Sequence, residues 1–275
     1  MIFKKKSFCL ALAPVFLLLL FSLIGSFFTP HDPFEQQLQQ SLLPPSSEYI
    51  CGTDRYGRCV FSRILAGAPL SVFTALLLTA AAALTGTAAG MCSGYYRGSL
   101  ADKSLLNLTN IVLAFPGIVL ALAITGIFGG SMPTAAFALL FSSWAPYARL
   151  VRQQIITVSQ APYIEAAKLC GCTDTEILCR HLLPIAAKPV LIMAAANIGT
   201  MLLMLSGLSF LGFGAQPPAA EWGAMISSSR SLMQAAPWTV FAPGSALFIA
   251  VCCFNFSGNA LHDLLEPDHN NFLKE

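Results

Sequence analysis

The chain has 275 residues, of which 56% are hydrophobic and 10% are charged, and its mean hydropathy is +0.69. In soluble domains roughly a quarter of the residues are charged, so this composition excludes an ordinary soluble fold and indicates an all-α membrane protein. The net charge of +2 neither requires nor excludes a charged partner. Nine cysteines, an odd number mostly within apolar runs, do not suggest a disulfide framework.

Uncharged runs long enough to cross a bilayer recur along the chain. The first follows Lys4-Lys5-Lys6 and has no clear small-x-small cleavage site, so it predicts a retained span. The longest run holds two spans, which Phe128-Gly-Gly-Ser-Met-Pro133 separates. Six transmembrane helices are predicted, over residues 8–28, 69–93, 105–127, 133–152, 188–211 and 238–261.

The distribution of positive charge predicts the orientation of these spans. With the triple-lysine end inside, 11 of the 15 Lys and Arg residues are cytoplasmic and four are outside. This asymmetry follows the positive-inside rule and predicts a cytoplasmic N-terminus. The expected divisions are an N-terminal span with an outer linker (1–68), a core of five spans (69–268) with a cytoplasmic loop (160–187), and a cytoplasmic tail (269–275).

A charged stretch follows the outer linker and begins at Gly52. Its glycines allow a tight outer turn, and its one acid, Asp54, is followed closely by three bases. These charges predict an interfacial network of Asp54 with Arg55, Arg58 and Arg63. A run of solvated charges is the alternative.

The long polar interruption in the C-terminal half runs from Tyr163 to Pro184. Strong helix formers precede Gly171, which offers a left-handed helix stop. Thr173 and Glu176 stand at capping-box spacing and start a second helix, which we expect Pro184 to end. The pattern predicts a rigid, solvent-facing elbow of two short helices. An ordinary amphipathic loop is the alternative.

A third irregular stretch follows the fifth predicted span. Gly212, Gly214 and the pair Pro217-Pro218 precede Trp222 and cannot continue a helix in lipid. The segment must therefore lie in an outer loop or be buried against protein.

The elbow carries a recognisable spacing. Glu165-Ala166-Ala167 is followed after three residues by Gly171, and Leu183-Pro184 ends thirteen positions after that glycine. This pattern resembles the EAA loop of binding-protein-dependent ABC transporter permeases. In that family the loop is the coupling helix, which docks on a cytoplasmic ATPase.

The outer motifs limit the resemblance to one branch of this family. The Gly-Thr-Asp, Gly-Arg, Ser-Arg series from Gly52 and the later Ser209-Phe-Leu-Gly are similar to C-type subunits of the peptide and nickel branch. The likeness runs from about residue 8 to residue 268. Cys59 stands where the branch usually carries Asp, so one ion pair of the network is in doubt. The branch also carries a charged motif at the end of the sixth span. Here Asn259 stands in place of its acid and His262 in place of its base.

The resemblance implies an ABC type I importer permease fold with a cytoplasmic coupling helix, in the bacterial inner membrane. The implied partners are a homologous second permease, two ABC ATPases, an extracytoplasmic binding protein and membrane lipid, with no nucleic acid. ATP and Mg belong to the ATPases, and no cofactor is expected in this chain. The implied ATPase-coupling residues are Glu165, Ala166, Ala167, Gly171, Leu183 and Pro184, and the outer network or gate comprises Asp54, Arg58, Arg63, Gly212, Gly214 and Trp222.

Two further segments bear on the cargo. The stretches 143–152 and 220–226 look more like nickel permeases than peptide permeases, and the compact length agrees. The expected cargo is therefore nickel, as ions or chelates. Import of dipeptides or oligopeptides is the alternative.

Other kinds of chemistry find little support in the sequence. No Gly-x4-Gly-Lys-Ser/Thr segment occurs, so no P-loop is expected and the chain is not predicted to be an enzyme. Uncharged spans argue against a self-sufficient channel or carrier, which would place charges or broken helices at mid-membrane. Cys170, Cys172, Cys179 and His181 crowd the elbow and suggest a metal sensor, but Cys179 and His181 lie about 200° apart around a helix, so no metal site is expected.

Overall fold

The computed structural model describes residues 2–265, and within them the secondary structure is helical apart from one isolated bridge between Thr53 and Cys59. The predicted tail, 269–275, lies outside the described residues. Short 3-10 segments occur at Gly25–Phe27 (η1), Leu38–Gln40 (η2) and Arg230–Leu232 (η4). The helices are α1 (Ile2–Ile24), α2 (Val60–Tyr95), α3 (Leu100–Ala114), α4 (Gly117–Phe128), α5 (Met132–Ser143), α6 (Ala145–Val158), α7 (Pro162–Leu169), α8 (Asp174–Glu176), the π-helical η3 (Ile177–Leu182), α9 (Leu183–Phe210), α10 (Trp222–Ser229) and α11 (Trp238–Leu265).

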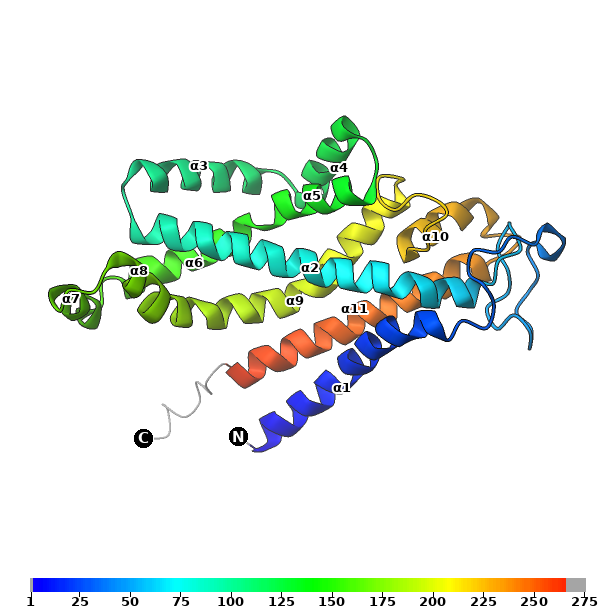
Figure 1. Cartoon of the computed structure of the whole chain (residues 1–275), viewed down its shortest axis with the longest axis horizontal. Helices are drawn as coiled ribbons and strands as arrows, with labels where there is room; N and C mark the ends of the chain where they lie inside the picture. Colours follow the sequence, from blue (N-terminus) through cyan, green and yellow to red (C-terminus); the bar gives the residue numbers. More distant parts are fainter. Residues whose placement is uncertain (1, 266–275) are drawn as a thin grey trace.

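The long helices form an elongated bundle with different structures at its two ends (Figure 1). The elbow of α7 and α8 lies at one end, and the linker after α1 lies at the other end with α10 nearby. The N-terminal end of α1 points toward the elbow end, and α1 runs beside α11. The elbow and the outer linker are thus separated by the length of the bundle, as the sequence predicts.

Three described helices are long and apolar enough to cross a membrane: α2, α9 together with its preceding turns, and α11. They contain the predicted spans 69–93 and 238–261, and α9 covers the predicted span 188–211 as far as Phe210. A fourth span is possible by length and composition if α3 and α4 are taken as one bent pair. The class of fold matches the expectation, whereas the count of six spans stays a prediction.

The expectation of unbroken spans is wrong at one place, and a second predicted span is interrupted by a single residue. The predicted span 105–127 is α3 and α4, which meet at an angle of 93°. Pro116 explains this break because a residue before proline avoids helical geometry, and Phe115 is extended with φ −105° and ψ 142°. The predicted span 133–152 is interrupted only at Trp144 between α5 and α6; Trp144 keeps helical angles of φ −75° and ψ −30°, and Pro146 lies in the first turn of α6.

Glycines along one face of α2 hold the bundle together. Gly86, Gly90 and Gly94 recur at intervals of four, so they lie on one face of the helix. A Cβ added at Gly86 would lie 2.4 Å from the Trp144 carbonyl oxygen, and one at Gly90 would lie 2.6 Å from that of Ala148. These glycines let the backbones of α2 and α6 approach closely, as small residues do in membrane bundles.

Candidate functional site

The outer turn is organised around the carboxylate of Asp54. One oxygen accepts hydrogen bonds from the backbone N–H groups of Tyr56 at 2.8 Å and Arg58 at 3.0 Å. The other accepts from Arg58 Nε at 2.7 Å and lies 2.6 Å from its Nη2. Gly57, at φ +74°, supplies the left-handed residue that the turn needs. The predicted Asp54–Arg58 pair is therefore present, and both residues are buried.

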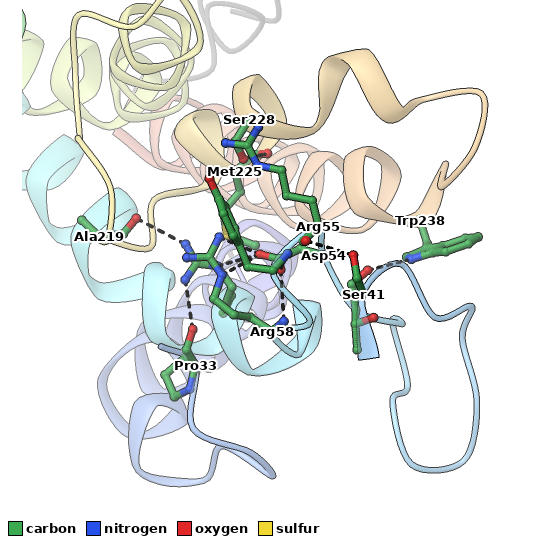
Figure 2. Close-up of polar contacts among 12 residues, drawn as sticks. Pro33, Ser41, Asp54, Arg55, Arg58, Ala219, Met225, Ser228 and Trp238 are labelled. Carbon is green, nitrogen blue, oxygen red and sulfur yellow. Dashed lines mark hydrogen bonds and ion pairs between the residues drawn. The ribbon is translucent and has the colours of Figure 1, made fainter. Parts of the chain in front are cut away.

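Arg63 extends this network to distant parts of the chain, namely to Pro33 and Ala219, which are labelled in Figure 2. Its Nε lies 3.9 Å from Asp54 Oδ2, and its Nη1 donates to the Pro33 carbonyl at 2.9 Å. Its Nη2 makes a long contact of 3.5 Å with the Ala219 carbonyl. Because Arg63 is only 5% exposed, it ties the outer linker, the start of α2 and the loop after α9 together. Arg55 instead lies over the ring of Tyr56, at 4.7 Å.

The outer linker is fastened beside this network. The His31 and Tyr49 rings stack at 4.7 Å, and the Tyr49 hydroxyl donates to Gln40 Oε1. Burial raises the pKa of the Tyr49 phenol, so it stays protonated and able to donate. Trp238 Nε1 donates to the Thr53 carbonyl at 3.2 Å, which joins α11 to the same turn.

A small cavity of about 160 Å³ lies between the arginines and the loop after α9. Arg55, Arg58 and Arg63 line it, and Asp54 is the carboxylate bound to this group. The loop contributes Gly212 and Gln216 to the opposite wall. This outer cavity therefore carries an excess of positive charge, which suits an anionic group.

The loop after α9 is packed against protein only in part: Gly214 and Ala215 are buried, whereas Gly212, Pro217 and Pro218 are exposed. Gly212, at φ +89°, ends α9. A Cβ added at Gly214 would lie 2.0 Å from Ser209 Oγ, so that position requires glycine. Trp222 is 1% exposed, and its Nε1 donates to the Ile64 carbonyl at 3.1 Å.

Sequence reasoning missed the role of Glu221, which is fully buried. Its carboxylate caps α10 by accepting from the N–H groups of Gly223 at 3.0 Å and Ala224 at 2.9 Å. Ser206 Oγ donates to it at 3.2 Å, and Ser71 Oγ makes a longer contact of 3.4 Å. An acid directly before a short helix was the available signal, because such residues are preferred N-caps.

The elbow has the two features predicted for its turn. Gly171 adopts φ +86°, and Thr173 and Glu176 form the capping box, with Thr173 N donating to Glu176 Oε2 at 2.8 Å. The expectation that Pro184 ends the second helix is wrong. The chain continues through the π-helical η3 into α9, because a wider turn accommodates a residue without an N–H.

The predicted coupling residues lie mostly at the surface. Glu165, Ala166 and Gly171 are exposed, Ala167 is half-buried, and Leu183 and Pro184 are exposed at the start of α9. Ile164 and Ile177 are fully buried and anchor the loop to the bundle. Leu169, which the sequence analysis did not single out, is a 90% exposed apolar side chain beside them. Within residues 2–265, no three His, Cys, Asp or Glu side chains are grouped to hold a metal.

A second ion pair near the elbow, between the buried Asp102 and the half-buried Arg152, was also missed. Arg152 Nε lies 2.9 Å from Asp102 Oδ1, and its Nη2 donates to Oδ2 at 3.1 Å. Ser93 Oγ donates to the same carboxylate at 2.6 Å. The pair joins α2, α3 and α6, and only their meeting in space reveals it, since the residues are far apart in sequence.

The sequence matches two family models. The first is described as a binding-protein-dependent transport system inner membrane component and matches residues 82–270. The second is described as the N-terminal TM domain of oligopeptide transport permease C and matches residues 1–45.

Similar proteins carry several cargo names. A dipeptide transport system permease of Alkalihalophilus pseudofirmus is 36% identical over 264 residues, which cover 96% of this chain and 86% of that protein. A glutathione transport system permease of Pectobacterium atrosepticum is 39% identical over 223 residues, 81% of this chain and 74% of that protein. A nickel transport system permease of Escherichia coli K12 is 34% identical over 264 residues, 96% of this chain and 95% of that protein.

A solved structure shares the fold. An inward-facing MetNI methionine ABC transporter matches with a TM-score of 0.53 at 17% identity, over 72% of this chain and 95% of that chain. The sequence relatives and this fold agree with the multi-pass arrangement of apolar helices. The chain therefore belongs to the inner membrane components of binding-protein-dependent transport systems, as a C-type permease subunit of an ABC importer.

Proposed function

We propose that this chain shares a transport path with a second, homologous permease and couples it to two cytoplasmic ABC ATPases. An extracytoplasmic binding protein delivers cargo at the outer end, and the ATPases bind ATP and Mg²⁺. The observation that carries this arrangement is the placement of the exposed elbow and the buried outer network at opposite ends of the bundle. Movement of the elbows then switches the path between its two openings.

The elbow is the proposed ATPase contact. Its exposed surface combines the apolar Leu169 with Glu165 and Ala166, which suits a partner groove that buries a short helix. The buried Ile164 and Ile177 fix this surface to the bundle, so a displacement of the elbow is transmitted rather than absorbed.

For the cargo we propose a small organic molecule with carboxylate groups, and nickel held in an organic chelate is the first candidate. The cationic outer cavity supports this choice because it attracts a carboxylate and repels a bare metal cation. The nickel permease relative also matches this chain over nearly its whole length. A short peptide is the second candidate, supported by the dipeptide permease relative, which covers as much of this chain.

Uptake by cells with and without this chain tests the cargo. Radioactive nickel is supplied as the free ion and as its citrate chelate, and a radiolabelled dipeptide is supplied separately. Loss of chelate uptake on deletion supports the first candidate, and loss of dipeptide uptake alone supports the second. Loss of free-ion uptake alone overturns an organic cargo.

Gly171 tests the coupling role. Gly171→Val places a β-branched residue at φ +86°, which L residues rarely adopt, in open space where no neighbour clashes. Transport is expected to fall to background while the variant still inserts in the membrane. Gly126→Val, in open space on α4 but without the positive φ, is the control. Normal uptake by Gly171→Val would count against coupling through the elbow.

A further inference from the structure

The end of α2 contacts both helices of the elbow. Tyr95, the last residue of α2, donates its hydroxyl to Oδ1 of Asp174, the first residue of α8, at 2.6 Å. Lys168, in the last turn of α7, places its ammonium group 5.3 Å from the centroid of the Tyr95 ring. The Tyr96 hydroxyl makes a longer contact of 3.4 Å with Asp174 Oδ2. We call these four residues the clasp.

The contacts of the clasp have the geometry of directional interactions. A distance of 2.6 Å between a hydroxyl and a carboxylate oxygen is typical of a charge-assisted hydrogen bond, which is stronger than a neutral one. The ammonium group of Lys168 lies within the range in which a cation is attracted to a ring face. The rings of Tyr95 and Tyr96 meet edge to face at 5.1 Å. The Tyr95 side chain is thus held on several sides.

The clasp bridges a gap in the apolar packing. An apolar cavity of about 780 Å³ lies between α2 and the second half of the elbow with the start of α9. Leu84 and Met91 line its wall on α2, and Leu178 and Leu183 line the wall opposite. Because the cavity interrupts direct packing between these two walls, polar bonds at the end of α2 supply the connection there.

The helices that the clasp joins are two of the long spans. Tyr95 ends α2, and Asp174 begins the helical run that continues to Phe210. The opposite ends of the same two helices are also joined, since Arg63 in the first turn of α2 makes its long contact with the Ala219 carbonyl in the loop after α9. The two spans are therefore tied at the elbow and again at the outer network.

We propose that Tyr95 and Asp174 are positioning residues for coupling, and that the clasp passes movement of the elbow to α2 as well as to α9. The inference rests on the proposed contact between the elbow and the ATPases. Movement between distant sites is carried by rigid elements and the bonds that join them. Without the clasp, the elbow shifts relative to α2 across the cavity, and ATP is hydrolysed with less transport.

Single substitutions remove the central bond of the clasp in the complete transporter, reconstituted with its sister permease, ATPases and binding protein. Tyr95→Phe removes only the hydroxyl and keeps the ring beneath Lys168. Asp174→Ala removes the acceptor, and Asp174→Asn keeps a neutral one. The matched controls are Tyr163→Phe, which removes a hydroxyl from the exposed start of the elbow, and Asp263→Ala, which removes an exposed carboxylate near the end of α11.

Two quantities are measured: the cargo imported per ATP hydrolysed, with nickel citrate and with a dipeptide, and the amount of ATPase that copurifies. Tyr95→Phe and Asp174→Ala are each expected to lower the import ratio roughly three- to tenfold, the scale of one hydrogen bond. Asp174→Asn should give an intermediate ratio. The double variant should be no worse than either single variant, because both remove the same bond. Copurification of the ATPase should not change.

The possible failures are distinguishable. If the wild-type transporter imports neither probe, or if Gly171→Val imports normally, the proposed function is wrong. If the wild type imports one probe, Gly171→Val does not, and both single clasp variants match their controls, the clasp inference alone is overturned. Additive losses in the double variant would also overturn it, since Tyr95 and Asp174 would then act separately. A fall in copurified ATPase would do the same, because the two residues would then be contacts of the ATPase.

Discussion

The outer network and the elbow are built in opposite ways. At the outer end Asp54, Arg58 and Arg63 are buried and bonded to segments from three parts of the chain. At the elbow most side chains are exposed, and buried contacts come chiefly from Ile164 and Ile177. The outer end is thus specified by contacts within the chain, whereas the elbow presents a surface whose contacts must come from another protein.

This comparison predicts that outer substitutions cost stability and elbow substitutions cost coupling. The largest effect is expected for Asp54→Ala, which leaves two buried guanidinium groups without their carboxylate. Removing one partner of a buried pair costs about 3–5 kcal/mol. Thermal unfolding of the purified chain in detergent measures this loss. Asp263→Ala, at a carboxylate that is 77% exposed, is the control and should unfold like the wild type.

A smaller loss is expected for Glu221→Gln. The amide keeps the size of the side chain, but its NH₂ group replaces one of the two oxygens that accept separately from the N–H groups of Gly223 and Ala224, so one of these donors loses its acceptor. An unsatisfied buried donor costs about 1–3 kcal/mol. The same unfolding measurement applies, with the exposed Glu48→Gln as control. Equal stability of the two variants would show that Glu221 does not cap α10 as described.

The smallest change in stability is expected for Leu169→Ser at the elbow. A surface substitution of this kind changes the free energy of unfolding by about 0.5 kcal/mol or less. Copurification of the ATPase with the permease should nevertheless fall, because an apolar contact is lost from the proposed interface. Leu100→Ser, at a leucine that is 83% exposed on α3, is the control. If as much ATPase copurifies with Leu169→Ser as with the wild type, this residue is not part of the interface.

Local signals in the sequence predicted the elbow well. The left-handed Gly171 and the capping box of Thr173 and Glu176 depend on residues a few positions apart, so spacing alone specifies them. The Asp54–Arg58 pair belongs to the same class, since four residues separate the partners. In each case all the interacting groups lie within a few residues of one another in the sequence.

Features that need tertiary contacts escaped prediction. Hydropathy counts apolar residues and does not register a bend, so the 93° turn at Pro116 was hidden inside one predicted span. The burial of Glu221 depends on Ser71 and Ser206, and the Arg152–Asp102 pair joins helices 50 residues apart. The π-helical turn before Pro184 also escaped, because proline normally indicates an end.

That π-helical turn makes the second helix of the elbow and α9 a single rod. From Asp174 to Phe210 the helix runs for 37 residues, or roughly 55 Å at 1.5 Å per residue. Gly212, in a left-handed conformation directly beyond it, is a natural pivot at the outer end. About that pivot a tilt of about 5° displaces the elbow by roughly 5 Å and the middle of the rod by about half as much. A modest push at the cytoplasmic surface is therefore felt as a shift of roughly 2–3 Å at the middle of the rod.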